Sequence, residues 1–219
     1  MQLVCLHGFA TSSRIWHNQK VDYAPELNFE DLRAESQKLA ENLGPDVILV
    51  GWSMGGMVAL QVAAWAPAKV LGLVLVSTTP KFIKSEDFPY GLPPALLKRL
   101  QKRIKSEGIS AFHSLIFKKN EVVGLAHISA EVAEKEMPEL AKADLRELLP
   151  EIKVPTLIIH GSQDQICLPS VAKFMKNRIP SSKLVMLDGI GHAPMIEVPQ
   201  LFNLHLQRFI GNYVKQRRD

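Results

Sequence analysis

Short runs of consecutive apolar residues alternate along the chain with longer segments whose apolar positions repeat at a helical period. The runs are rich in Val, Leu and Ile, which is typical of parallel strands buried on both faces. They are Leu3–Leu6, Val47–Val50, Val70–Val76, Thr156–Ile159 and Leu184–Leu187. Helical spacing is found in Phe29–Leu43, Gly56–Ala66, Ser170–Arg178 and Gln200–Lys215. This alternation predicts an α/β layered fold with a mostly parallel sheet.

One weaker strand and one long interruption complete the predicted architecture. Lys20–Ala24 is a sixth strand candidate, so the sheet is expected to have about six strands. From Lys81 to Ile152 no strand-like run occurs, and helical patterns are broken by prolines and glycines. Because unstructured loops of that length are rare in compact domains, a helical insertion is favoured over an irregular surface excursion. We expect a core formed by residues 1–80 and 153–219 and a helical lid formed by residues 81–152.

Size and composition fit one globular domain with an insertion. The chain has 219 residues, of which 47% are hydrophobic and 22% charged. These values exclude a mainly disordered, fibrous or disulfide-stapled protein. The two cysteines, Cys5 and Cys167, have no regular spacing and are too few for a structural zinc site. Neither a metal nor a cofactor is expected.

The first residues and the length of the apolar runs predict where in the cell the protein is found. Residues 1–8 contain no basic leader, and their apolar run is too short for the core of a signal peptide, so a cytoplasmic location is expected. No stretch approaches the roughly 18 apolar residues of a membrane-spanning helix, so stable membrane insertion is not expected. We also expect a monomer without a nucleic-acid partner.

The strongest chemical signal is the pattern Gly-x-Ser-x-Gly formed by Gly51, Ser53 and Gly55. It follows the apolar run Val47–Val50 and precedes the helical segment Gly56–Ala66, which is the strand, turn and helix setting that the pattern requires. A serine in a strained turn exposes its hydroxyl, and flanking glycines let strand and helix approach without a Cβ clash. Although five-residue matches occur by chance, the flanking elements favour Ser53 as a nucleophile.

A serine hydroxyl is a weak nucleophile until a base removes its proton, so a histidine and an orienting acid are needed. Asp164 follows the strand candidate Thr156–Ile159, and His192 follows Leu184–Leu187. Loops at the ends of parallel strands project into a common crevice. The order Ser, Asp, His differs from the trypsin and subtilisin orders. Asp188 competes as the acid because it is close to His192, but its position predicts that it ends its strand and caps a turn.

Attack on a carbonyl also needs hydrogen-bond donors for the oxyanion, and a missing donor typically costs about 100-fold or more in rate. The backbone N–H of Met54, directly after the serine, is one candidate donor. The second candidate is the backbone N–H of Phe9, in the loop after the first strand, where Gly8 allows a tight turn. His7 is interpreted as structural, holding this loop by a hydrogen bond.

Four motifs together resemble the α/β-hydrolase superfamily. They are Leu6-His7-Gly8-Phe9, Gly51–Gly56, His160–Asp164 and Gly191-His192-Ala193-Pro194. Within it, the segments Gly51–Gly56, Ser77–Phe82 and Asp144–Arg146 are similar to the pimeloyl-[acyl-carrier protein] methyl ester esterases of biotin synthesis. The resemblance implies hydrolysis of a methyl ester on a pimeloyl chain that is carried by acyl carrier protein.

A basic helix in the predicted lid offers a physical basis for such a partner. Residues 81–119 hold nine Lys or Arg and three Asp or Glu, whereas the whole chain has a net charge of +4. In Pro94–Glu107, four apolar residues share one face: Leu96, Leu97, Leu100 and Ile104. The predicted carrier-docking residues on another face are Lys98, Arg99, Lys102 and Arg103. Their charges would steer an acidic carrier protein, while a solvated face and contact with anionic lipid stay open.

Large apolar residues are candidates for the wall of an acyl tunnel, because ligand pockets are mostly hydrophobic. The candidates for contact with substrate are Phe9, Trp52, Met54, Phe82, Phe112 and Leu115. Core packing explains aromatic residues equally well.

Together these patterns predict a serine carboxylesterase whose nucleophile, base and acid are Ser53, His192 and Asp164. Two alternatives stay open. The first is a small-molecule or lipid carboxylesterase, or a thioesterase, with the same fold. The second is a catalytically silent binding module, because a fold does not fix a function; the complete set of catalytic residue types argues against it.

Overall fold

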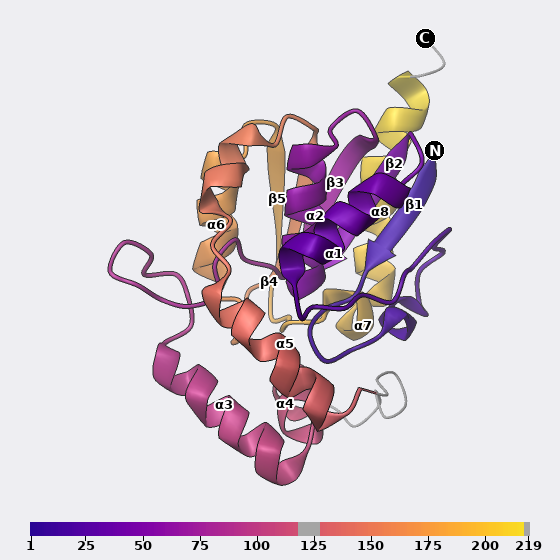
Figure 1. Cartoon of the computed structure of the whole chain (residues 1–219). Helices are drawn as coiled ribbons and strands as arrows, with labels where there is room; N and C mark the ends of the chain where they lie inside the picture. Colours follow the sequence, from indigo (N-terminus) through magenta and orange to yellow (C-terminus); the bar gives the residue numbers. More distant parts are fainter. Residues whose placement is uncertain (118–127, 217–219) are drawn as a thin grey trace.

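The computed structural model describes residues 1–117 and 128–216, in which five parallel strands form one sheet (Figure 1). The strands are β1 (Gln2–Leu6), β2 (Val47–Trp52), β3 (Val70–Val76), β4 (Thr156–Gly161) and β5 (Ser182–Leu187). They lie in the order of the sequence, with Val50 of β2 aligned to Cys5 of β1 and to Val74 of β3. Every residue of β2 is buried, as expected for a central strand covered on both faces. The five strong strand predictions and the α/β fold are therefore confirmed.

Helices cover both faces of the sheet (Figure 1). One face carries α1 (Leu32–Asn42), α2 (Met54–Trp65) and α6 (Pro169–Arg178). The other carries α8 (Pro199–Gln216), preceded by α7 (Pro194–Glu197), together with the 3-10 turn η1 (Ser13–Trp16). Helix α1 begins three residues later than the apolar pattern suggests, because the Asp31 side chain accepts the backbone N–H of Ala34 at 2.9 Å and caps the helix.

The predicted sixth strand, Lys20–Ala24, is wrong. This segment pairs with β1 at an isolated bridge between Val4 and Tyr23, and its backbone hydrogen bonds with β1 are confined to Leu3 and Cys5. The side chain of Asp22, rather than a strand carbonyl, accepts the backbone N–H of Leu3 at 2.7 Å. Tyr23 is 49% exposed, and Pro25 follows with no N–H to donate. The segment therefore has no buried residue, and its pairing with β1 does not continue beyond Tyr23.

The chain between β3 and β4, predicted as the lid, contains α3 (Pro94–Glu107), α4 (Ser110–Ile116), α5 (Ala130–Lys142) and the 3-10 helix η3 (Arg146–Glu151). Residues 118–127 of the predicted lid lie outside the described residues. Helices α3 and α4 lie beyond the end of the sheet, and α5 leads back toward the core (Figure 1). Leu97, Leu100 and Ile104 of α3 are buried, so the apolar face of the basic helix packs inward.

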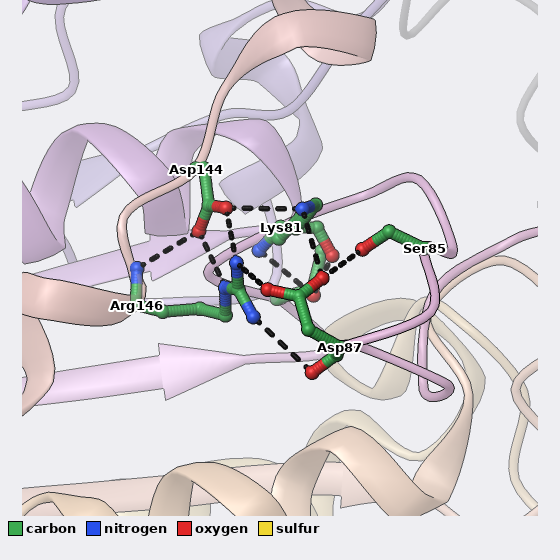
Figure 2. Close-up of polar contacts among 6 residues, drawn as sticks. Lys81, Ser85, Asp87, Asp144 and Arg146 are labelled. Carbon is green, nitrogen blue, oxygen red and sulfur yellow. Dashed lines mark hydrogen bonds and ion pairs between the residues drawn. The ribbon is translucent and has the colours of Figure 1, made fainter.

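An ionic cluster joins the two ends of this insertion (Figure 2). Lys81, at its start, is 3.1 Å from Asp144, which lies between α5 and η3. Arg146 bonds both Asp144 at 2.7 Å and Asp87 at 2.8 Å. Hydrogen bonds from Ser85 and Arg146 lower the pKa of Asp87 to about 2. Burial alone would raise the pKa of Asp144, but its bonds with Arg146 and Lys81 lower it below the ordinary value.

Candidate active site

Ser53 lies in a sharp turn between β2 and α2. Its φ of +53° and ψ of −121° are rare for a residue with a side chain and cost about 1–3 kcal/mol. The turn is held from below, because the Ser53 N–H donates to the Val76 carbonyl at 3.0 Å and the Thr78 hydroxyl donates to the Ser53 carbonyl at 2.6 Å. A β-carbon on Gly51 would come within 2.5 Å of the Gly55 carbonyl oxygen, so β2 and α2 can cross this closely only with glycine at position 51.

The structure brings the three residues predicted for the triad into one hydrogen-bonded chain. The distance between Ser53 Oγ and His192 Nε2 is 3.0 Å, and that between His192 Nδ1 and Asp164 Oδ2 is 2.8 Å. Asp164 follows β4 and His192 follows β5, so the carboxyl ends of three strands meet here. Both distances are within hydrogen-bond reach of a nucleophile, a base and an orienting acid.

Asp164 is 3% exposed and is held as a carboxylate. Its Oδ1 accepts the backbone N–H groups of Ile166 at 2.8 Å and Cys167 at 3.0 Å. Burial alone would raise the pKa of Asp164, but His192 and His160 lower it well below the ordinary value. The competing acid, Asp188, instead accepts the hydroxyl of Ser162 at 3.0 Å at the end of β5. This position agrees with its predicted role in ending the strand.

Two further side chains, Trp52 and Glu197, hold the backbone at His192. The indole N–H of Trp52 donates to the His192 carbonyl at 2.8 Å, and the two rings are 5.4 Å apart. The Glu197 carboxylate accepts the N–H groups on either side of it, from Gly191 and Ala193. Trp52, predicted to line the acyl tunnel, is 0% exposed. In this conformation it supports His192 from beneath and presents no surface to a ligand.

The loop after β1 lies directly against the serine turn. A β-carbon on Gly8 would be 2.9 Å from Ser53 Cβ, and one on Gly55 would clash with the His7 carbonyl oxygen. Phe9 lies in this loop and Met54 is the first residue of α2. The two residues predicted to donate their N–H groups to the oxyanion therefore lie on the two segments that border Ser53. His7 accepts the Leu27 N–H through Nε2 at 2.9 Å and bonds the Gly8 carbonyl through Nδ1 at 3.0 Å, consistent with its predicted structural role.

A cavity of about 460 Å³ lies beneath the lid, next to the Asp164 loop. We call it the lid pocket, and its lining consists of Phe82, Leu92, Leu96, Arg99, Leu100, Arg103, Leu115, Gln165 and Ile166. Phe82 and Leu115, two of the predicted acyl-contacting residues, are thus brought together. Phe9, Met54 and Phe112 are not in this lining, and Phe9 and Phe112 pack edge to face at 5.0 Å.

The basic residues of α3 divide into two groups. Arg99 and Arg103 line the lid pocket, so their charges border an apolar space. Arg103 also pairs with Glu107 one turn later at 2.9 Å. Lys98 and Lys102 are exposed beside them. Leu96 and Leu115 are each 46% exposed, and they give the pocket an apolar rim next to this charge.

The comparisons with known proteins agree with this geometry. The model of the alpha/beta hydrolase family matches residues 3–203. The chain belongs to the alpha/beta hydrolase family.

Relatives of this hydrolase include two named pimeloyl-[acyl-carrier protein] methyl ester esterase. That of Nitrosospira multiformis is 30% identical, over 94% of this chain and 93% of the relative. That of Nitrosomonas europaea is 28% identical, over 91% of this chain and 92% of the relative. An esterase of Exiguobacterium antarcticum has the same fold, with a TM-score of 0.84 and 23% identity over 96% of this chain and 92% of that structure. The predicted class, a carboxylic ester hydrolase, is confirmed.

Among residues 1–117 and 128–216, no three His, Cys, Asp or Glu side chains are grouped so that they could hold a metal ion. In the same described ranges, no helix combines the length and apolar character needed to cross a membrane.

Two residues between β3 and β4, outside the set predicted for the site, contact the loop after β1. His113 of α4 bonds the Ala10 carbonyl at 2.9 Å, and Ala10 has a φ of +55°. Glu136 of α5, 1% exposed, accepts the backbone N–H of Phe29 at 3.3 Å. Burial raises the pKa of Glu136 to about 7, although the N–H groups of Phe29 and Ala10 partly oppose this effect. An acid between the apolar positions Ala133 and Met137 is the sequence signal for such a buried group.

The pKa of Glu136 predicts a pH dependence of stability. Because the folded-state pKa is raised, stability falls as pH rises from about 4.5 to about 7, where only the unfolded state has lost the proton. Glu136→Gln removes this loss, so at pH 8 it should be more stable than the wild type by about 3 kcal/mol. Urea unfolding at pH 5 and pH 8 measures the difference. The exposed Glu134→Gln on the same helix is the control, and equal pH slopes for all three proteins would contradict the prediction.

Proposed function

We propose that this carboxylic ester hydrolase is a serine esterase that acts on a methyl ester of an acyl chain carried by acyl carrier protein. The observation that carries the serine mechanism is the hydrogen-bonded chain of Ser53, His192 and Asp164 at 3.0 and 2.8 Å. The names of the relatives, which include pimeloyl-[acyl-carrier protein] methyl ester esterase, support the substrate class.

The proposed reaction has two steps. In the first, Ser53 Oγ attacks the ester carbonyl carbon while His192 Nε2 takes the hydroxyl proton, and Asp164 stabilises the imidazolium. The tetrahedral intermediate collapses as His192 protonates the departing alkoxide, which leaves as methanol. In the second step, water activated by His192 attacks the acyl-enzyme and releases the carboxylic acid. The N–H groups of Phe9 and Met54 stabilise the oxyanion in both steps.

Two features of the lid support a carrier-bound acyl chain. The lid pocket offers a mostly apolar space of about 460 Å³ next to the Asp164 loop, which suits an acyl chain. Arg99 and Arg103 line this space and the exposed Lys98 and Lys102 adjoin it on α3. Such a group of cations favours an acidic partner at the rim of the pocket.

The first experiment is mass spectrometry of methyl-pimeloyl acyl carrier protein after incubation with the enzyme. We expect loss of the methyl group alone with the wild type and no change with Ser53→Ala, because triad serines account for about a million-fold in kcat. Loss of the whole acyl group would instead identify a thioesterase. An unchanged carrier, combined with cleavage of p-nitrophenyl acetate, would show an esterase with a different substrate.

The assignment of the acid is tested by two matched substitutions. Asp164→Asn removes the carboxylate that holds His192 and should lower kcat by about 10⁴-fold. Asp188→Asn changes a carboxylate that contacts only the Ser162 hydroxyl among the bonds described here, and it should retain activity within about twofold. Initial rates on p-nitrophenyl acetate measure both. The reverse pattern would assign the acid to Asp188.

Carrier docking is tested by neutralising the basic face of α3. A variant with Gln at positions 98, 99, 102 and 103 should raise KM for the carrier-linked ester by about tenfold or more, with a smaller effect on p-nitrophenyl acetate. A variant with Gln in place of the exposed Lys20, Lys173, Lys183 and Arg208 is the charge-matched control. Equal losses on both substrates, or equal losses in both variants, would contradict docking at α3.

A further inference from the structure

A second histidine contacts the acid of the candidate triad. His160 is the fifth residue of β4 and is 0% exposed. Its Nε2 is 2.7 Å from the Cys167 carbonyl oxygen and 3.3 Å from Asp164 Oδ2. Its Nδ1 is buried and has no hydrogen-bond partner among the described residues.

These contacts define the tautomer of His160. Both neighbours of Nε2 are acceptors, so Nε2 must carry a hydrogen and donate it. A second hydrogen on Nδ1 would be buried with no acceptor, which is unfavourable. The ring therefore holds its proton on Nε2, directed at the Cys167 carbonyl and, more weakly, at the Asp164 carboxylate.

Asp164 thus has four donors around it. Two backbone N–H groups bond Oδ1, whereas Oδ2 faces the two histidine rings, His192 at 2.8 Å and His160 at 3.3 Å. We propose that His160 is a positioning residue for the reaction, which orients Asp164 and moderates the negative charge that Oδ2 presents to His192. This role rests on the proposed serine mechanism.

Moderating that charge has a defined sign. A donor to Oδ2 stabilises the carboxylate and weakens its attraction for a proton on His192. Without His160, Oδ2 would attract the imidazolium form of His192 more strongly, which would oppose the neutral form that takes the proton of Ser53.

Other groups around His192 do not replace His160 in this role. Ser53 bonds the opposite ring nitrogen, and Glu197 accepts backbone N–H groups of the neighbouring residues. Cys167 is fully buried, and burial raises the pKa of its thiol well above the ordinary value, so it stays uncharged. Asp188 is exposed and faces Ser162. The contact with Asp164 Oδ2 is therefore specific to His160 and His192 among these groups.

A purely structural role is the alternative, in which His160 fastens the loop through the Cys167 carbonyl alone. Two variants separate the roles. His160→Phe keeps a ring of similar size without a donor, and His160→Gln places an N–H donor near the position of Nε2. Their folding is compared by circular dichroism and by thermal melting.

The experiment measures kcat, KM and the pH profile of kcat/KM with p-nitrophenyl acetate. For His160→Phe we expect kcat to fall about tenfold with KM within about twofold, and the acidic limb of kcat/KM to move up by about half a pH unit or more. His160→Gln should return both readouts toward the wild type. An unchanged acidic limb in His160→Phe, or equal losses in both variants, would overturn the proposal.

A measurement on the wild type keeps the proposal testable if His160→Phe does not fold. In ¹⁵N NMR of histidine-labelled enzyme, with His160→Gln used to assign the signal, we expect the Nε2–H tautomer of His160. A proton on Nδ1 would overturn the proposal. No hydrolysis of the ester by the wild type would instead contradict the proposed function, and the NMR result does not depend on activity.

Discussion

The backbone conformation of Ser53 is the constraint on which the rest of the site depends. A left-handed residue between β2 and α2 is tolerated only because the surroundings leave it no alternative. The N–H of Ser53 is tied to β3, and its carbonyl is tied to Thr78. The close approach of the β1 loop needs glycine at positions 8 and 55. The sheet thus holds the strained turn in place, and the turn in that conformation exposes the Ser53 hydroxyl group.

The buried acid of the site, Asp164, also depends on its surroundings. A carboxylate as deeply buried as Asp164 is stable only when its oxygens are fully hydrogen-bonded. The loop supplies two backbone donors and the histidines supply the others. The buried Glu136 lacks such a set of donors: one of its oxygens has no partner among the described residues, and its pKa is raised rather than lowered. For Asp164 the two histidines outweigh the effect of burial on the pKa, whereas for Glu136 the effect of burial prevails.

Local patterns could be read from the sequence, whereas contacts between distant segments could not. The strands and the serine turn were predictable because apolar runs and paired glycines act within a few residues. Lys20–Ala24 was wrongly predicted as a strand because the Asp22 side chain, instead of a backbone carbonyl, accepts the N–H of Leu3 in β1. The contact of Glu136 with Phe29 spans 107 residues, so no local pattern reports it. His160 stood beside Asp164 in a motif, but its contact depends on how the loop folds back onto β4.

The ionic cluster of Lys81, Asp87, Asp144 and Arg146 also bears on how such a protein can change over evolutionary time. It brings together the points where the lid leaves the core and returns to it. The entropy of closing the intervening chain rises only slowly with its length. With its ends fixed in this way, the chain between Lys81 and Asp144 can gain, lose or exchange segments at little thermodynamic cost to the sheet. The lining of the cavity can therefore change while the hydrogen-bonded chain from Ser53 to Asp164 stays unaltered.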